Sequence, residues 1–151
     1  MSSFISLTLS PTPLVSFNIA TPSRTLDAIA ASQEFNIHIL AGDATGVAIA
    51  DRFTRGNGDD VASLIEEKAS SLTGEDGQHS APLIESQGIL RVLRCRLLSD
   101  TAEGGLIQIR DHMIVVGEVL EVVSRREVKD FGLAYADRRY RRTGGVIEDQ
   151  R

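Results

Sequence analysis

Residues 111–123 read D-H-M-I-V-V-G-E-V-L-E-V-V, and from His112 to Val123 they have the pattern of a strand that is apolar on both faces. One face would carry Ile114, Val116 and Leu120, and the other would carry Val115, Val119 and Val123. A strand of this kind belongs inside a barrel or a covered sheet. Because an unpaired carboxylate in such a strand is costly, we expect Glu118 to have an arginine partner from the 91–96 strand.

Two more strands are predicted before this run. In residues 93–97, Leu93, Cys95 and Leu97 alternate with two arginines, so one face is expected to be buried and the other exposed to solvent. Residues 100–105 end in Gly-Gly, which is typical of a hairpin connection, and Leu106–Ile109 forms the strand after it. The second half of the chain is therefore rich in strands.

The first half of the chain mixes strands with helices. Leu14–Ala20 has the period-two pattern of a half-buried strand, and Pro11 and Pro13 mark its entry or an exposed edge. The segments predicted next are a helix at Leu26–Ala31 capped by Ser23 or Thr25, a strand at Phe35–Leu40, a helix at Thr45–Arg55, a helix from Asp59 or Asp60 through Ile65, and a surface loop at Ser70–Pro82. The order of these elements indicates a mainly β fold with a few helices, in which a small barrel would hide the strand edges.

The composition limits the class of protein. The chain has 151 residues, a net charge of −5, 42% hydrophobic residues and one cysteine. This length fits one domain, and no apolar run approaches the roughly 18–20 residues of a membrane span. The acidic balance argues against nucleic-acid binding. One cysteine cannot form an internal disulfide, and the three histidines lack the spacing of metal ligands, so no metal site is expected.

Small polar residues cluster around the first predicted strand, and two interpretations of them stay open. The cluster consists of Ser2, Ser3, Ser6, Ser16, Asn18, Ser23, Arg24 and Thr25. Hydroxyls, an amide and the free N–H groups of a short helix can bind a phosphate and a polar heterocycle, with Arg24 adding charge. The simpler interpretation is that these side chains face water or cap the helix, and the pattern alone favours it.

The neighbours Asp111 and His112 are not expected to form a nucleophile triad by themselves, because successive residues of a strand point to opposite faces. The stretch Arg138–Arg142 contains four arginines, but it is too short for a nucleic-acid stripe in an acidic chain.

Several segments resemble, in order, the flavin reductase-like family of FMN-binding split barrels. The matching segments are Ser2–Leu7, Pro13–Ile19, Pro22–Thr25, Phe35–Leu40, Ala50–Phe53, Leu133–Tyr135 and Arg139–Arg141. The most specific match is Asp111–Val119, which is similar to the family's D-H-x-I-x-x-G-E-V strand. The resemblance implies a Greek-key-like split β-barrel over residues 1–142 with a flexible tail at 143–151. It also implies an N-terminally truncated chain, since the family's first helix and strand would precede Ser2.

The resemblance also implies a flavin site. It suggests FMN, with FAD as the alternative, and NADH or NADPH as co-substrate. The implied flavin-binding residues are Ser2, Ser3, Phe4, Ser16, Asn18, Ser23, Arg24, Thr25, Arg52 and Phe53. His112 matches the family's histidine near the flavin and nicotinamide, where it would orient the dihydropyridine or assist proton movement. The competing interpretation of His112 is a strand histidine that is hydrogen-bonded in place. The segment Arg138–Arg142 would lie near the flavin or a dimer contact, or form a solvated tail.

The function expected from the resemblance is NAD(P)H-dependent reduction of flavin by a cytoplasmic homodimer. Reduced flavin would go to a partner monooxygenase, and no membrane or nucleic-acid partner is expected. An organellar targeting segment could be missing with the N-terminus. The alternative is a non-catalytic flavin-binding or protein-interaction module with an incomplete site.

Overall fold

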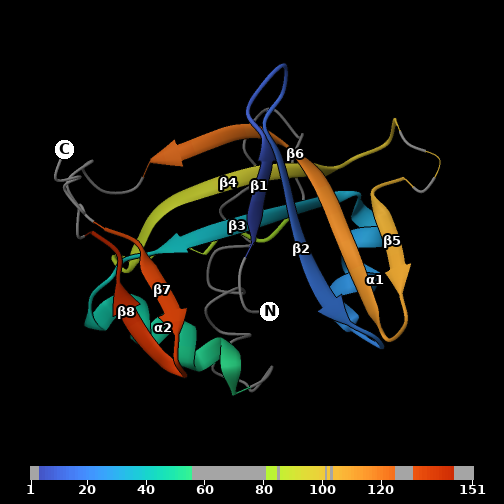
Figure 1. Cartoon of the computed structure of the whole chain (residues 1–151). Coiled ribbons are helices and arrows are strands. Elements are labelled where there is room, and N and C mark those ends of the chain that lie inside the picture. Colours follow the sequence, from blue (N-terminus) through green and yellow to red (C-terminus); the bar gives the residue numbers. More distant parts are fainter. Residues whose placement is uncertain are drawn as a thin grey trace, which may run out of the picture.

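The fold is described from a computed structural model, which covers residues 4–55, 81–84, 86–100, 102, 104–124 and 131–144. Its main sheet has the strand order β1-β2-β6-β4-β3, and β5 also pairs with β6 (Figure 1). The strands are β1 (Ile5–Thr8), β2 (Leu14–Ala20), β3 (Glu34–Leu40), β4 (Ile89–Leu97), β5 (Leu106–Ile109) and β6 (His112–Ser124). All neighbouring strands of this sheet run antiparallel.

Strand β6 pairs with three other strands, β2, β4 and β5. Its first half pairs with β2 and β5, and its second half pairs with β4. Val115 of β6 is buried in the main core, but Leu120 and Val122 are exposed, so the expected covering of both faces is not found in its second half. In the described part of the chain the sheet stays open between its end strands β1 and β3. The prediction of a mainly β, split-barrel fold is confirmed.

The main core lies between the sheet and helix α1 (Arg24–Ser32). The helix buries Leu26 and Ile29 among side chains from four strands. The rings of Phe17 and Phe35 meet edge to face at its centre, with centroids 5.3 Å apart. The other buried members are Val15, Ile37, Cys95, Leu97 and Val115. Burial of this apolar surface fixes the start of α1 relative to β2.

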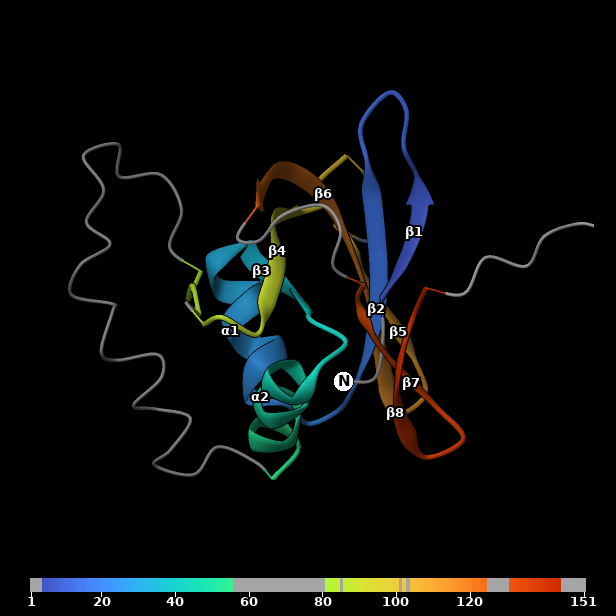
Figure 2. The same cartoon turned by 90° about the vertical axis from the view of Figure 1, so that its left-hand side faces the viewer.

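Helix α2 (Ala44–Thr54) covers a second, smaller cluster at the end of β3. Ile49 packs there with Leu83, Ile84, Ile89 and Val92. A Cβ atom at Gly46 would lie 2.0 Å from the carbonyl oxygen of Ala41, so only glycine allows this close approach. Figure 2 shows α1 and α2 on the same side of the sheet formed by β2, β5 and β6.

A separate hairpin follows the main sheet. It consists of β7 (Leu133–Ala136) and β8 (Arg139–Arg142) and is attached to the end of β3 by a bridge between Ala41 and Gly132. Figure 1 places α2 and this hairpin at one end of the molecule, while α1 and β5 lie at the other. The molecule therefore offers two separated ends at which a ligand could bind.

Most predicted elements are found within two residues of their expected bounds, and Leu14–Ala20 and Leu106–Ile109 match their predicted ranges. The pattern alone did not indicate β1. The helix expected near residues 59–65 and most of the loop expected at 70–82 lie outside the described residues, as do residues 145–151 of the expected tail. At the start of that tail, Thr143 donates hydrogen bonds from its backbone N–H and its hydroxyl to the carbonyl oxygen of Gly132. In the described ranges, no helix is both long and apolar enough to cross a membrane.

Candidate functional site

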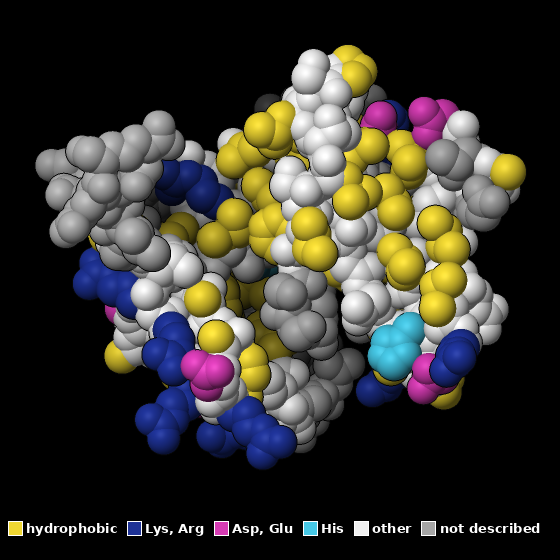
Figure 3. Space-filling model, in the orientation of Figure 1, with side chains coloured by type: hydrophobic (Ala, Val, Ile, Leu, Met, Phe, Trp, Pro, Cys, Tyr) yellow, Lys and Arg dark blue, Asp and Glu magenta, His cyan; other side chains and the backbone are white. Residues whose placement is uncertain are grey.

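The site is built on the face of the sheet that points away from the main core, here called the outer face. Cross-strand pairs place Ser16 with Val116, Asn18 with Ile114, and Ala20 with His112 on this face. Strand β5 extends it, because Ile107 pairs with Ile114, and Ile109 pairs with His112. Figure 3 shows hydrophobic side chains gathered over β1, β2, β5 and β6. The outer face therefore combines an exposed apolar surface with a few polar groups.

Helix α1 begins beside one end of this face. Ser23 is the N-cap, and its hydroxyl accepts a hydrogen bond from the backbone N–H of Leu26 at 3.4 Å. The chain just before the helix is tied to the turn between β5 and β6, because Thr21 donates from its backbone N–H to the carbonyl oxygen of Asp111 at 2.8 Å. The hydroxyl of Thr21 donates to the same oxygen at 3.1 Å. The start of α1 and His112 are thus neighbours.

The structure overturns the strand-alternation argument for Asp111 and His112, although it does not contradict the expectation that they form no nucleophile triad by themselves. Asp111 lies in the turn before β6 rather than on the strand, so the alternation of strand side chains does not apply to it. Its carboxylate Oδ1 lies 3.0 Å from Nδ1 of His112. Asp111 is largely exposed and His112 is about half exposed, with side-chain exposures of 82% and 47%. The two side chains form a hydrogen-bonded pair that leaves Nε2 of His112 available.

The predicted binding residues near the first strands lie in three different parts of the structure. Ser16 is half-buried and Asn18 is exposed, both on the outer face. Arg24 and Thr25 are exposed in the first turn of α1, next to the cap. Phe4 instead packs partly buried against the main core. Ser2 and Ser3 lie outside the described residues. The structure therefore places Ser16 and Asn18 on the same face as His112. It places Ser23, Arg24 and Thr25 at the start of α1, just after Thr21.

Arg52 and Phe53 are exposed at the other end of the molecule, on α2 (Figure 1). Helix α2 lies against the β7–β8 hairpin, because Tyr140 of β8 contacts Asp51 and Thr54 of α2. Burial, and then the Asp51 carboxylate, raise the pKa of Tyr140 above its ordinary value. The four arginines of the stretch 138–142 are exposed on this hairpin. The structure thus groups Arg52 and Phe53 with the basic hairpin and not with His112.

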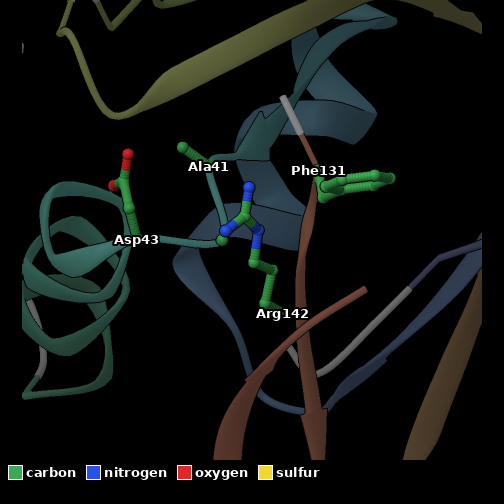
Figure 4. Close-up of a pocket in the computed structure, with 5 residues that line it drawn as sticks. Ala41, Asp43, Phe131 and Arg142 are labelled. Carbon is green, nitrogen blue, oxygen red and sulfur yellow. The ribbon is translucent and has the colours of Figure 1, made fainter. Parts of the chain in front are cut away.

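A small hollow also lies at this second end. Its lining residues are Ala41, Gly42, Asp43, Phe131 and Arg142, and its volume is about 80 Å³. Figure 4 shows Arg142 reaching from β8 towards Ala41, with Asp43 and Phe131 on either side. The guanidinium of Arg142 lies over the ring of Phe131, 5.2 Å from its centroid. Because ligand pockets usually measure roughly 300–1,000 Å³, this hollow is too small for a flavin ring.

Other polar groups singled out from the sequence have structural roles. Arg96 Nη2 lies 3.0 Å from Oε2 of Glu118, which confirms the predicted arginine partner. Nε2 of His38 accepts a hydrogen bond from the backbone N–H of Ile84 at 3.1 Å. Burial raises the pKa of Cys95 to about 12, so its thiol stays protonated and inert. In the described ranges, no three His, Cys, Asp or Glu side chains lie close enough together to hold a metal ion.

Two features of the site were missed from the sequence. The contribution of Ile107 and Ile109 follows from the pairing of β5 with β6, and their alternation with polar neighbours was a usable signal for an apolar outer edge. The contact of Thr21 with Asp111 joins residues 90 positions apart, so no local pattern indicated it.

A known domain family matches nearly the whole of this sequence, and several solved structures have a similar fold. A sequence model described as flavin reductase like domain matches residues 1–144. A flavin reductase domain protein from Arthrobacter sp. FB24 has a TM-score of 0.68 and 21% identity, over 97% of this chain and 79% of that one. The NADH:FAD oxidoreductase SgcE6 of Streptomyces globisporus C-1027, in complex with NAD and FAD fragments, has a TM-score of 0.65 and 24% identity, over 97% and 76%. The styrene monooxygenase flavin reductase SMOB from Pseudomonas putida S12 has a TM-score of 0.63 and 15% identity, over 97% and 80%.

Proposed function

The chain belongs to the flavin reductase like domain family, and on that basis we propose that it binds a flavin on the outer face and reduces it with NADH or NADPH. The main support for this proposal is that His112 lies near the start of α1. Hydrogen bonds from Thr21 to the carbonyl oxygen of Asp111 link the turn before His112 to the segment that leads into α1. An anion-binding helix end and a group that can hold or move a proton lie next to each other there. A flavin nucleotide needs both an anion site and a site for its ring.

The residues on this face and at the start of α1 fit the parts of a flavin nucleotide. The exposed apolar side chains Ile107 and Ile109 suit the flat ring. The N-terminus of α1, with the Ser23 hydroxyl and the Arg24 guanidinium, suits a phosphate. Ser16 and Asn18, Thr25, and the N-terminal residues Ser2, Ser3 and Phe4 are the further proposed contacts. Arg52 and Phe53 would reach this flavin only from another subunit, given their place on α2.

The proposed flavin is FMN, because one helix end offers a place for one terminal phosphate. FAD is the alternative, and the structural neighbour from Streptomyces globisporus, which is named an NADH:FAD oxidoreductase, supports it. Titration with each nucleotide distinguishes them, since a diphosphate bound by the protein would make FAD bind more tightly than FMN.

His112 is the proposed catalytic residue. A bound flavin would supply the hydride acceptor for the nicotinamide, so no protein nucleophile is required. His112 would use Nε2 to orient the nicotinamide or to hold a proton at the flavin edge. The apolar side chains of β5 and β6 would exclude water from the stacked rings.

We further propose that two copies pair through the outer face. Ile109 is 52% exposed, and Ile5 and Ile107 are exposed on the same face. Large exposed apolar patches commonly mark interfaces. Pairing would close the flavin site on its open side, so light scattering should give twice the chain mass. The structural neighbour from Pseudomonas putida is named a styrene monooxygenase flavin reductase, which supports transfer of reduced flavin to a monooxygenase.

Two assays test the function. Purified protein should quench the fluorescence of FMN at micromolar concentration and should oxidise NADH in the presence of free flavin. His112→Ala should lower kcat by roughly 10²–10⁴-fold, the range expected for loss of a positioned proton-holding group. Gln108→Ala, a change at an exposed position of β5, is the control and should leave the rate unchanged. Flavin binding without NADH or NADPH oxidation would favour the alternative, a non-catalytic flavin-binding module.

A further inference from the structure

We propose that Asp111 is a positioning residue for His112: its carboxylate accepts the Nδ1–H of the imidazole and so turns Nε2 toward the ligand on the outer face. This inference rests on the proposed function, because it concerns the same histidine. It gives Asp111 a role, although the strand pattern predicted that Asp111 and His112 point to opposite faces. It predicts one preferred neutral tautomer of the ring, with the proton on Nδ1 and the lone pair on Nε2.

The geometry supports a fixed orientation. The distance from Oδ1 of Asp111 to Nδ1 of His112 is 3.0 Å, which is a normal hydrogen-bond length. The backbone of Asp111 is itself held, because its carbonyl oxygen accepts two hydrogen bonds from Thr21. The imidazole is therefore connected, through Asp111 and Thr21, to the segment that leads into α1. One chain of hydrogen bonds sets the histidine relative to the helix end.

The chemistry of the pair points the same way. A neutral imidazole has one donor and one acceptor nitrogen, so a carboxylate at Nδ1 selects the tautomer with its hydrogen there. The hydrogen bond with His112, followed by a backbone hydrogen bond and the charge of the imidazolium, lowers the pKa of Asp111 below its ordinary value. The carboxylate is therefore ionised at neutral pH and remains an acceptor.

The pair of Asp111 and His112 contributes little to stability, so its proposed role is tested against an equally exposed pair elsewhere. Asp111 is 82% exposed, and exposed ion pairs add little to stability. Asp137 gives a matched comparison, since it also lies in a hairpin turn, is 80% exposed and pairs with an exposed basic side chain, that of Arg141. Asp137 lies on the distant hairpin, where no role in the reaction is proposed.

The test combines ring nitrogen chemical shifts with kinetics. In the wild type, ¹⁵N shifts of the neutral His112 ring should show a protonated Nδ1 and an unprotonated Nε2. Asp111→Ala should shift the ring towards the Nε2–H tautomer and lower kcat by roughly tenfold or more, since His112 stays in place but loses its fixed orientation. The dissociation constant for FMN should change less than twofold, because the proposal gives Asp111 a role toward His112 and none toward the flavin. Asp111→Glu should recover part of the rate, whereas Asp137→Ala should change neither the shifts nor kcat.

Two results would overturn the positioning role. One is an unchanged tautomer in Asp111→Ala, and the other is a changed tautomer with an unchanged kcat. Failure of the proposed function is distinguishable, because a wild type that oxidises neither NADH nor NADPH refutes the reductase activity directly. The tautomer measurement does not depend on that activity and decides the orientation on its own.

Discussion

Gly117 of β6 lies directly against the ring of Phe35, at the point where β6 passes from β2 and β5 to β4. A Cβ atom at position 117 would lie 2.5 Å from Cζ of Phe35 and 2.8 Å from the carbonyl oxygen of Arg96. Because interiors are close-packed, neither neighbour can move away without disturbing the main core. Gly117→Ala should lower the free energy of unfolding by about 1–3 kcal/mol, the usual cost of overpacking. Urea denaturation measures this loss.

Gly132 is the control for this substitution. The atom nearest to a Cβ placed at Gly132 is the Thr143 hydroxyl oxygen, at 3.7 Å, which is an ordinary contact. Gly132→Ala should therefore leave the urea midpoint nearly unchanged. Equal losses in both variants would mean that Phe35 does not require the glycine.

The cap of α1 gives the second prediction. The Ser23 hydroxyl accepts from the N–H of Leu26, whereas Thr25 lies inside the first turn. Ser23→Ala should destabilise the protein by about 1 kcal/mol, as expected for loss of an N-cap, and Thr25→Ser should have a much smaller effect. Thermal unfolding of both variants measures the difference. A larger loss in the Thr25 variant would reverse the assignment of the cap.

The ion pair of Arg96 and Glu118 gives the third prediction. The carboxylate is half-buried between β4 and β6, and the guanidinium is exposed. A double-mutant cycle with Arg96→Ala and Glu118→Ala should give a coupling of about 0.5–1 kcal/mol that falls with added salt. The more exposed carboxylate of Glu121, paired with Arg94, should give a weaker coupling. A coupling of zero at Arg96 and Glu118 would show that the strand tolerates an unpaired Glu118.

The fourth prediction concerns pH. Burial raises the pKa of Cys95 from 9.0 to about 12, so the native state keeps a proton that the unfolded state loses above pH 9.0. Between pH 9.0 and about 12 the unfolded state binds fewer protons than the native state. The free energy of unfolding should therefore fall as the pH rises through this range, by at most about 1.4 kcal/mol per pH unit. The difference between wild type and Cys95→Ala, measured by urea denaturation across this range, isolates the effect. Parallel curves for the two proteins would contradict it.

Patterns within single segments predicted much of the fold and part of the site. Alternation located β2 and part of β4, a Gly-Gly turn located β5, and a run of apolar residues located β6. The place of a carboxylate in that apolar strand was enough to predict an arginine partner for Glu118. The same local reasoning failed at Asp111, because it assigned to the strand a residue that lies in the preceding turn. It also left β1 unassigned, since most of its side chains are exposed and its position follows from pairing with β2.

The grouping of the site residues could not come from local patterns. The outer face arises from the register of β2, β5 and β6, and the link between Thr21 and Asp111 joins distant parts of the chain. Arg52 and Phe53 lie on α2, at the other end of the molecule from His112, so segments that match one family need not lie close together in the folded chain.

The central claim is that flavin binds on the outer face between His112 and the start of α1. Chemical-shift mapping of methyl-labelled isoleucines during an FMN titration tests it most directly. The methyl groups of Ile107, Ile109 and Ile114 should shift together with the His112 ring, because they share this face. Those of Ile49 and Ile84, in the cluster under α2, should not shift. Shifts confined to the α2 and hairpin end, or no shifts at saturating FMN, would contradict the account.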